Sequence, residues 1–168
     1  GRYLASNIGV VTCNKIACAS SFKNYLDLKK ISRRYNTPFL FETNVGAGLP
    51  VIDTLNNLIA SGDKIHKIQA ILSGSLNYIF NKFNSKTTFK NVVQSAQNEG
   101  FTEPDPKIDL SGVDVARKIL ILARESGFKL ELNDIVNRSF LPLEVLNSLS
   151  IEEFYNAIDK NEVHFQSI

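Results

Sequence analysis

Residues 100–118 read GFTEPDPKIDLSGVDVARK, and this stretch decides more about the chain than any other. Each proline fixes its own φ angle and pushes the preceding residue towards an extended backbone, so we expect Glu103 and Asp105 on a stiff, non-helical loop. The loop opens into a helix on which Asp114 and Lys118, four positions apart, share one face. A rigid acidic loop that meets a helical Asp/Lys pair has the groups to hold an amino-acid-like molecule and supply a proton.

Simpler interpretations of the same stretch remain open. On spacing alone, Asp114 and Lys118 are more simply a solvated helical ion pair, which contributes about 0.3–0.5 kcal/mol. A calcium-binding EF-hand loop is excluded, because Asp105, Asp109 and Gly112 miss the spacing of its ligands and its glycine.

Segments on both sides of this loop alternate between strand and helix patterns. We expect strands at residues 8–12, 38–42 and 65–72, and the last is apolar on both faces and therefore central. Helices are expected at about 20–35, 51–61, 74–83, 89–99, 113–126 and 150–158, the last with a Ser150/Glu153 capping box. This order indicates an α+β fold with a mixed β-sheet covered by helices.

The helix at 113–126 has the widest apolar face. On a helical wheel its polar face carries Asp114 and Lys118 on one flank, and Arg117 and Arg124 on the other. The apolar face comprises Val115, Ala116, Ile119, Leu120, Leu122 and Ala123.

Length and composition favour an ordinary globular domain over residues 1–168. With 43% hydrophobic residues, 21% charged residues and a net charge of +2, the chain gives no electrostatic case for nucleic acid or an acidic membrane. It has no apolar run long enough to span a membrane. Cys13 and Cys18 indicate reduced thiols and a cytoplasmic protein. Because the chain starts at Gly1 and has no methionine, we expect a piece of a longer protein.

Two turns follow predicted strands. Residues 46–48 read Gly-Ala-Gly, but Val51 stands where a dinucleotide-binding turn has its third glycine, so that pattern fails. Such a turn can aim carbonyls at a cation, with Glu42 as a charged oxygen ligand, although a plain strand-to-helix turn is the simpler interpretation. Lys15 follows the first strand, where open sheets place ligand contacts; a surface lysine is the simpler alternative.

Taken together, these segments resemble homoserine dehydrogenase. The resemblance is colinear over most of residues 8–127 and rests on VVTCNK (10–15), FETNVGAGLPVI (41–52), ILSGSLNYIF (71–80) and GFTEPDPKIDLSGVDVARK (100–118). It implies an oxidoreductase that interconverts L-aspartate 4-semialdehyde and L-homoserine with NADP or NAD, in the aspartate pathway to threonine and methionine. It also implies a homodimer, and it looks like the form fused to an aspartate kinase domain.

The resemblance implies roles for residues of the acidic stretch and the first turn. Lys118 matches the lysine that delivers a proton to the carbonyl oxygen as hydride reaches its carbon; Asp114 orients it, and Lys15 is a second lysine beside nicotinamide and substrate. Glu103 matches the residue that binds the substrate ammonium group. The same amino-acid pocket is lined by Asp109, Asp114, Gly74 and Ser75.

Cofactor and cation contacts are implied in the same way. The cofactor contacts would be Lys15, Gly100 and Glu103. A monovalent cation site, usually sodium, would be formed by Glu42 with the carbonyls of Val45, Ala47 and Leu49.

The chain departs from the family pattern in several places. Cys13 replaces a common proline, Phe101 a tyrosine whose hydroxyl would lie near the substrate, and Ile108 an aspartate. The dinucleotide-binding half and the closing C-terminal segment are not among these 168 residues, so we expect the fragment alone to be inactive. A non-catalytic amino-acid-sensing or dimerisation module of the same fold remains the alternative.

Overall fold

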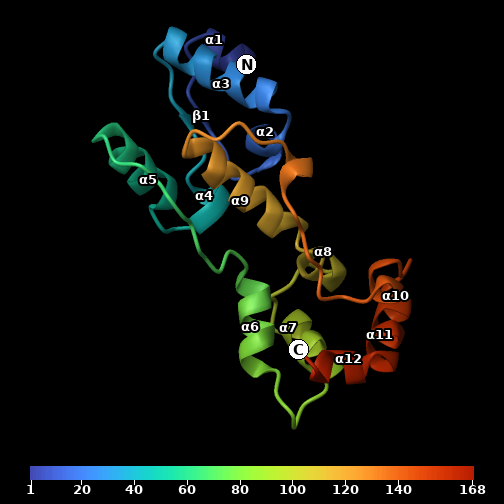
Figure 1. The fold of residues 1–168 in the computed structure, drawn as a ribbon. Coiled ribbons are helices and arrows are strands. Elements are labelled where there is room, and N and C mark those ends of the chain that lie inside the picture. Colours follow the sequence, from blue (N-terminus) through green and yellow to red (C-terminus); the bar gives the residue numbers. More distant parts are fainter. The chain divides into compact units, whose positions relative to one another are not determined.

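A computed structural model describes all residues from 1 to 168, with twelve α-helices, one 3-10 helix and two short strands (Figure 1). The chain forms two compact units, and each unit combines two separate segments. The first unit holds residues 1–72 and 115–136, and the second holds residues 73–114 and 137–168. None of the helices is both long and apolar enough to cross a membrane.

The first unit contains the sheet. Strands β1 (Val10–Val11) and β2 (Phe39–Leu40) pair in parallel, with Val10 opposite Phe39, so the α+β class is confirmed. The other elements of this unit are helical: α1 (Arg2–Ala5), α2 (Ile16–Ala19), α3 (Phe22–Arg34), α4 (Thr43–Gly46), α5 (Val51–Ala60), α9 (Val113–Glu125) and η1 (Leu132–Asp134). The first two residues of α9 belong to the second unit.

The core of the first unit joins α9 to the chain around the sheet. Its buried members are Cys18, Phe41, Val45, Ile52, Leu55, Ile121 and Leu122. The helical-wheel prediction for α9 was wrong at two positions, because Ile121 is buried and Arg124 is only 3% exposed. Arg124 is buried because main-chain carbonyls surround its guanidinium, as described below.

The predicted central strand at residues 65–72 was also wrong. The sheet consists of β1 and β2 alone, and no main-chain N–H between residues 65 and 72 donates a hydrogen bond to another part of the chain. Ile65 and Ile68 pack against the core of the first unit, whereas Ile71 is 79% exposed. An extended apolar segment becomes a strand only where a neighbouring strand satisfies its main-chain groups, and no strand within residues 1–168 pairs with this segment.

The second unit is helical. Its elements are α6 (Gly74–Lys82), α7 (Phe89–Asn98), α8 (Pro106–Leu110), α10 (Leu143–Leu146), α11 (Ile151–Lys160) and α12 (Glu162–Gln166). In the core, the ring of Phe89 on α7 stacks on that of Phe165 on α12 with centroids 4.1 Å apart, and Phe154 of α11 is fully buried. This core fixes α7, from which the acidic loop departs.

Side-chain caps lie at the starts of three helices whose positions were predicted, although only the cap at Ser150 was itself predicted. Ser73, Thr88 and Ser150 each accept a hydrogen bond from a main-chain N–H in the first turn of α6, α7 and α11. The predicted capping box at Ser150 is half formed, because the Glu153 carboxylate accepts from the N–H of Leu149 at 2.8 Å instead of that of Ser150.

Candidate active site

Three of the predicted substrate-binding residues meet in the second unit. The hydroxyl of Ser75 donates to Oδ1 of Asp109 at 2.9 Å, and the main-chain N–H of Glu103 donates to Oδ2 of the same carboxylate at 2.8 Å. The Ser73 hydroxyl lies 2.9 Å from that of Ser75 and extends the chain of hydrogen bonds. Asp109 therefore ties the acidic loop to the start of α6.

Local capping explains this arrangement. Ser73 caps α6 by accepting from the N–H of Leu76 at 3.1 Å, so Ser75 falls in the first turn, where its side chain is almost fully buried. Asp105 caps α8 by accepting from the N–H of Lys107 at 3.0 Å, with Pro106 at the first helical position. Glu103 thus stays outside the helix, as predicted. Its exposed carboxylate makes no hydrogen bond or ion pair and is open to a ligand.

Of Gly74 and Gly100, only Gly100 has a backbone conformation that requires glycine. Gly100 has φ +76° just beyond α7, where its N–H donates to the carbonyl of Gln97, so a residue with a side chain would be strained there. Gly74 begins α6, and a β-carbon there would have nothing within 4 Å. An open main chain at both positions leaves room for a bound molecule.

The predicted catalytic lysines lie in the first unit. Lys118 is half-buried on α9, and its ammonium group donates to the carbonyl of Leu72 at 2.8 Å. Lys15 is half-buried at the N-terminal boundary of α2. Asp114 lies in the first turn of α9 and is assigned to the second unit. That these residues and the Glu103 loop form one pocket stays a prediction of the resemblance.

The predicted cation turn lies between β2 and α5. Both carboxylate oxygens of Glu42 accept main-chain N–H groups at the start of α5, at 2.7 Å from Ile52 and 2.8 Å from Asp53. The carbonyl of Leu49 accepts from the N–H of Val51, while those of Val45 and Ala47 accept no hydrogen bond. A β-carbon on Gly46 would approach Val51 to 2.6 Å, which fixes glycine at this turn.

This oxygen set fits a weakly bound hard cation better than a transition metal. One carboxylate and main-chain carbonyls are ligands for cations of the sodium or calcium type, and no group of three or more His, Cys, Asp or Glu side chains gathers anywhere in the chain.

Comparison with known proteins assigns the family. The profile of the family described as homoserine dehydrogenase matches residues 50–164, which include the cluster at Ser75, Glu103 and Asp109. This chain belongs to the homoserine dehydrogenase family.

Individual relatives and solved structures match over more of the chain than the profile does. A chloroplastic bifunctional aspartokinase/homoserine dehydrogenase of Arabidopsis thaliana is 49% identical over 152 residues, which are 90% of this chain and 17% of that protein. A crystal structure of a Candida auris protein of unknown function superposes with a TM-score of 0.90 at 37% identity, over 99% of this chain and 48% of that one. The structure of a hyperthermophilic archaeal homoserine dehydrogenase in complex with NADPH superposes with a TM-score of 0.66 at 32% sequence identity, over 73% of this chain and 37% of that one. The chain thus spans less than half the length of each of these proteins.

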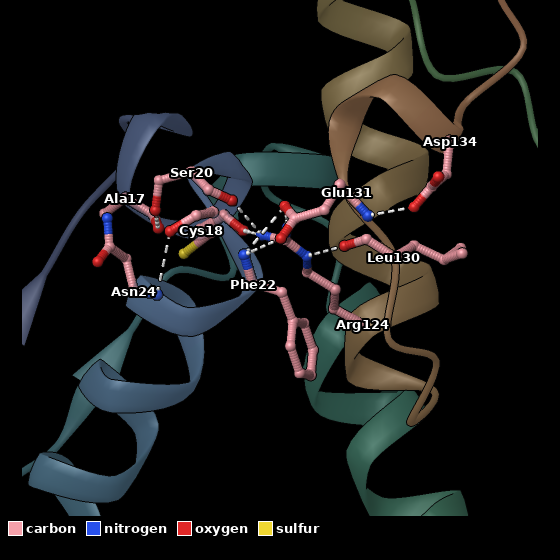
Figure 2. A network of polar contacts seen from close by, with 10 residues as sticks. Ala17, Cys18, Ser20, Phe22, Asn24, Arg124, Leu130, Glu131 and Asp134 are labelled. Carbon is pink, nitrogen blue, oxygen red and sulfur yellow. Dashed lines mark hydrogen bonds and ion pairs between the residues drawn. The ribbon is translucent and has the colours of Figure 1, made fainter.

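Sequence reasoning missed a network of polar contacts around Arg124 in the first unit (Figure 2). Arg124 of α9 donates to the carbonyls of Cys18 at 2.7 Å, Ser20 at 2.8 Å and Leu130 at 3.0 Å. Its second terminal nitrogen lies 3.0 Å from the Glu131 carboxylate, which also accepts the N–H of Phe22. Arg124 therefore fixes the junction between α2 and α3 at residues 20–21, five and six residues after Lys15.

A second buried group adjoins that network. The Tyr25 hydroxyl donates to Oε1 of Glu125 at 2.5 Å, and the Lys29 ammonium group lies 2.9 Å from Oε2. Burial, followed by the negative charge of Glu125, raises the pKa of the Cys18 thiol to about 12 and raises the pKa of Tyr25 as well. The only sequence signal for this group was a run of charge at the end of an apolar helix, which is usually a solvated face.

Proposed function

We propose that the protein to which this chain belongs is an NAD(P)-dependent homoserine dehydrogenase, and that residues 1–168 supply its substrate pocket and proton donor. The observation that supports this most directly is the joining of Ser75, Asp109 and Glu103 by hydrogen bonds, with the Glu103 carboxylate left open. Family membership supports the reaction class, and the archaeal relative was solved with NADPH.

In the proposed reaction, the chain binds the amino-acid end of L-aspartate 4-semialdehyde and handles one proton. Glu103 accepts charge-assisted hydrogen bonds from the substrate ammonium group, and Asp109 keeps the Glu103 loop in place. A bound nicotinamide cofactor supplies hydride to the aldehyde carbon. As negative charge develops on the carbonyl oxygen, Lys118 stabilises that charge and donates the proton.

Asp114 and Lys15 take supporting roles in this proposal. Asp114, one helical turn before Lys118, orients that ammonium group, and Lys15 lies beside the nicotinamide and the substrate. The open main chain at Gly100, next to Glu103, suits the approach of the cofactor. Glu42 with the carbonyls of Val45, Ala47 and Leu49 is proposed to hold a sodium ion.

The experiment is NADPH-dependent reduction of L-aspartate 4-semialdehyde by the full-length gene product and by the 168-residue chain. We expect activity in the full-length protein alone. Lys118→Ala should lower kcat at least a hundredfold and change KM less than threefold, because its proton is delivered only in the transition state. Lys129→Ala, an exposed lysine in the same unit, is the matched control. An unchanged kcat with a raised KM would refute the donor role.

The same experiment separates the alternative function. A folded full-length protein that binds homoserine without reducing the aldehyde would indicate an amino-acid-sensing module. Loss of both properties, with an intact oligomer, would indicate a dimerisation module.

We also propose a homodimer, a fused aspartate kinase domain and a cytoplasmic location. The kinase is supported by the bifunctional Arabidopsis relative, and the location by two cysteines that form no disulfide. Light scattering and sequencing of the complete gene test the first two, and fluorescence microscopy tests the third.

A further inference from the structure

Gln97 contacts both ends of residues 100–104, the part of the acidic loop that carries Glu103. The main-chain carbonyl of Gln97, on α7, accepts from the N–H of Gly100 at 3.1 Å. The side-chain Nε2 of the same residue donates to the carbonyl of Pro104 at 2.8 Å. Residues 100–104 are therefore closed into a loop by one glutamine, and Glu103 lies inside it.

Tyr155 holds the glutamine in turn. This tyrosine lies on α11, is 8% exposed, and donates its hydroxyl to Oε1 of Gln97 at 2.8 Å. The carbonyl of Pro104 can only accept, so the Gln97 amide must turn its NH₂ towards Pro104 and its oxygen towards the hydroxyl. Burial, and secondarily the charge of Asp105, raises the pKa of Tyr155 to about 12, so the hydroxyl keeps the proton that this arrangement needs.

A separate contact holds the far side of the loop. The ammonium group of Lys107 donates to the carbonyl of Ser148, which fixes α8 independently of Gln97. Loss of the glutamine would therefore release the Pro104 end of the loop, while α8 stays in place and Asp109 still accepts from the N–H of Glu103.

We infer that Gln97 and Tyr155 are positioning residues that hold the acidic loop so that the Glu103 carboxylate meets the substrate ammonium group. The inference rests on the proposed function. Neither side chain needs to touch the substrate, because the hydroxyl acts on the amide and the amide acts on the main chain of the loop.

The test uses the full-length protein and steady-state kinetics with L-aspartate 4-semialdehyde. Gln97→Ala, Gln97→Glu and Tyr155→Phe should each raise the KM for the aldehyde about fivefold, the change that corresponds to one lost hydrogen bond. The kcat and the KM for NADPH should stay within twofold. Gln97→Glu keeps the acceptor for Tyr155 and removes only the donor to Pro104.

Matched controls and a double variant sharpen the test. Gln94→Ala, on the same helix, and Tyr35→Phe make no corresponding contact and should behave as the wild type. Because the two residues act in series, Gln97→Ala/Tyr155→Phe should match Gln97→Ala alone rather than show the product of both effects.

Amide hydrogen exchange in residues 100–106 gives a readout independent of activity. Exchange there should rise in the Gln97 and Tyr155 variants and stay unchanged in the controls. Unchanged exchange would overturn the inference, as would faster exchange with an unchanged KM, or a fall in kcat and melting temperature together. An inactive wild type would refute the proposed function. Hydrogen exchange would still decide whether Gln97 and Tyr155 hold the loop.

Discussion

Arg124→Met is the most demanding test of how the first unit is held together. The Arg124 side chain is 0% exposed. Methionine keeps an unbranched apolar stem there but removes the guanidinium. Three main-chain carbonyls, at Cys18, Ser20 and Leu130, then lose their donor.

The magnitude follows from these three acceptors. A hydrogen bond to a charged group contributes about 1.5–3 kcal/mol, and a buried group left without a partner costs about 1–3 kcal/mol. The contributions are not additive, because water reaches part of the opened site and Leu130 is only half-buried. The ion pair with Glu131 adds little, since that side chain is 51% exposed. We expect a loss of about 3–5 kcal/mol in the free energy of local opening, in the range measured when one partner of a buried charge network is removed.

Native-state hydrogen exchange on the full-length protein measures this loss. A change of about 3 kcal/mol corresponds to at least a hundredfold faster exchange in the segment from α2 to the first turn of α3. Arg117→Met, on the same helix, is the control, because Arg117 is half-buried and makes no side-chain hydrogen bond to the chain. Arg124→Lys should recover less than half of the loss, because an ammonium group cannot reproduce the fork that reaches four acceptors. An Arg124→Met variant within 0.5 kcal/mol of its control would refute the reasoning.

Four further predictions concern single groups. In the folded protein at pH 8, a thiol reagent should label exposed Cys13 and spare Cys18, and mass spectrometry of the labelled peptides would detect a reversal. Because the pKa of Cys18 rises from 9.0 to about 12 on folding, its contribution to stability should be intact below pH 9 and fall by up to about 1.4 kcal/mol per pH unit between those values. In a urea-denaturation series, Cys18→Ala should remove the fall between pH 9 and pH 10, above which Tyr25, whose pKa is also raised, adds a loss of its own. Asp109→Asn keeps one acceptor and replaces the other with a donor, so the KM for the aldehyde should rise several-fold, and an unchanged KM would separate Asp109 from the substrate site. Glu42→Gln should weaken the start of α5 by about 1 kcal/mol and abolish any activation by sodium, whereas activation equal to that of the wild type would remove Glu42 from the cation site.

The sequence was most reliable where a signal is local. Helices α7, α9 and α11 lie within two residues of their predicted ends, because a capping side chain or a glycine with positive φ lies beside the segment it terminates. The same holds for the cluster at Asp109. Its three members lie on two short stretches whose turns are set by the caps Ser73 and Asp105, each next to the residues that it positions.

The failed strand at residues 65–72 shows where local signals end. Its apolar side chains indicate only that the segment prefers an extended backbone or burial, and burial is partly realised, since Ile65 and Ile68 pack on the core. Strand formation further requires a neighbour that supplies hydrogen bonds, and within residues 1–168 that neighbour does not exist. No pattern inside the segment itself carries that information.

The residues that hold the proposed site in place were hidden for a related reason. On a wheel, Arg124 falls on a polar flank, and Gln97 is one polar residue among several on α7, so neither stands out. Each becomes distinctive only when polar groups from distant segments meet it. The carbonyls of Cys18 and Ser20 accept from Arg124, and the Tyr155 hydroxyl of α11 donates to Gln97. Residues that touch a substrate must have particular chemistry and so leave a trace in the sequence. Residues that position them need only a hydrogen-bonding group at the right place, which the fold determines.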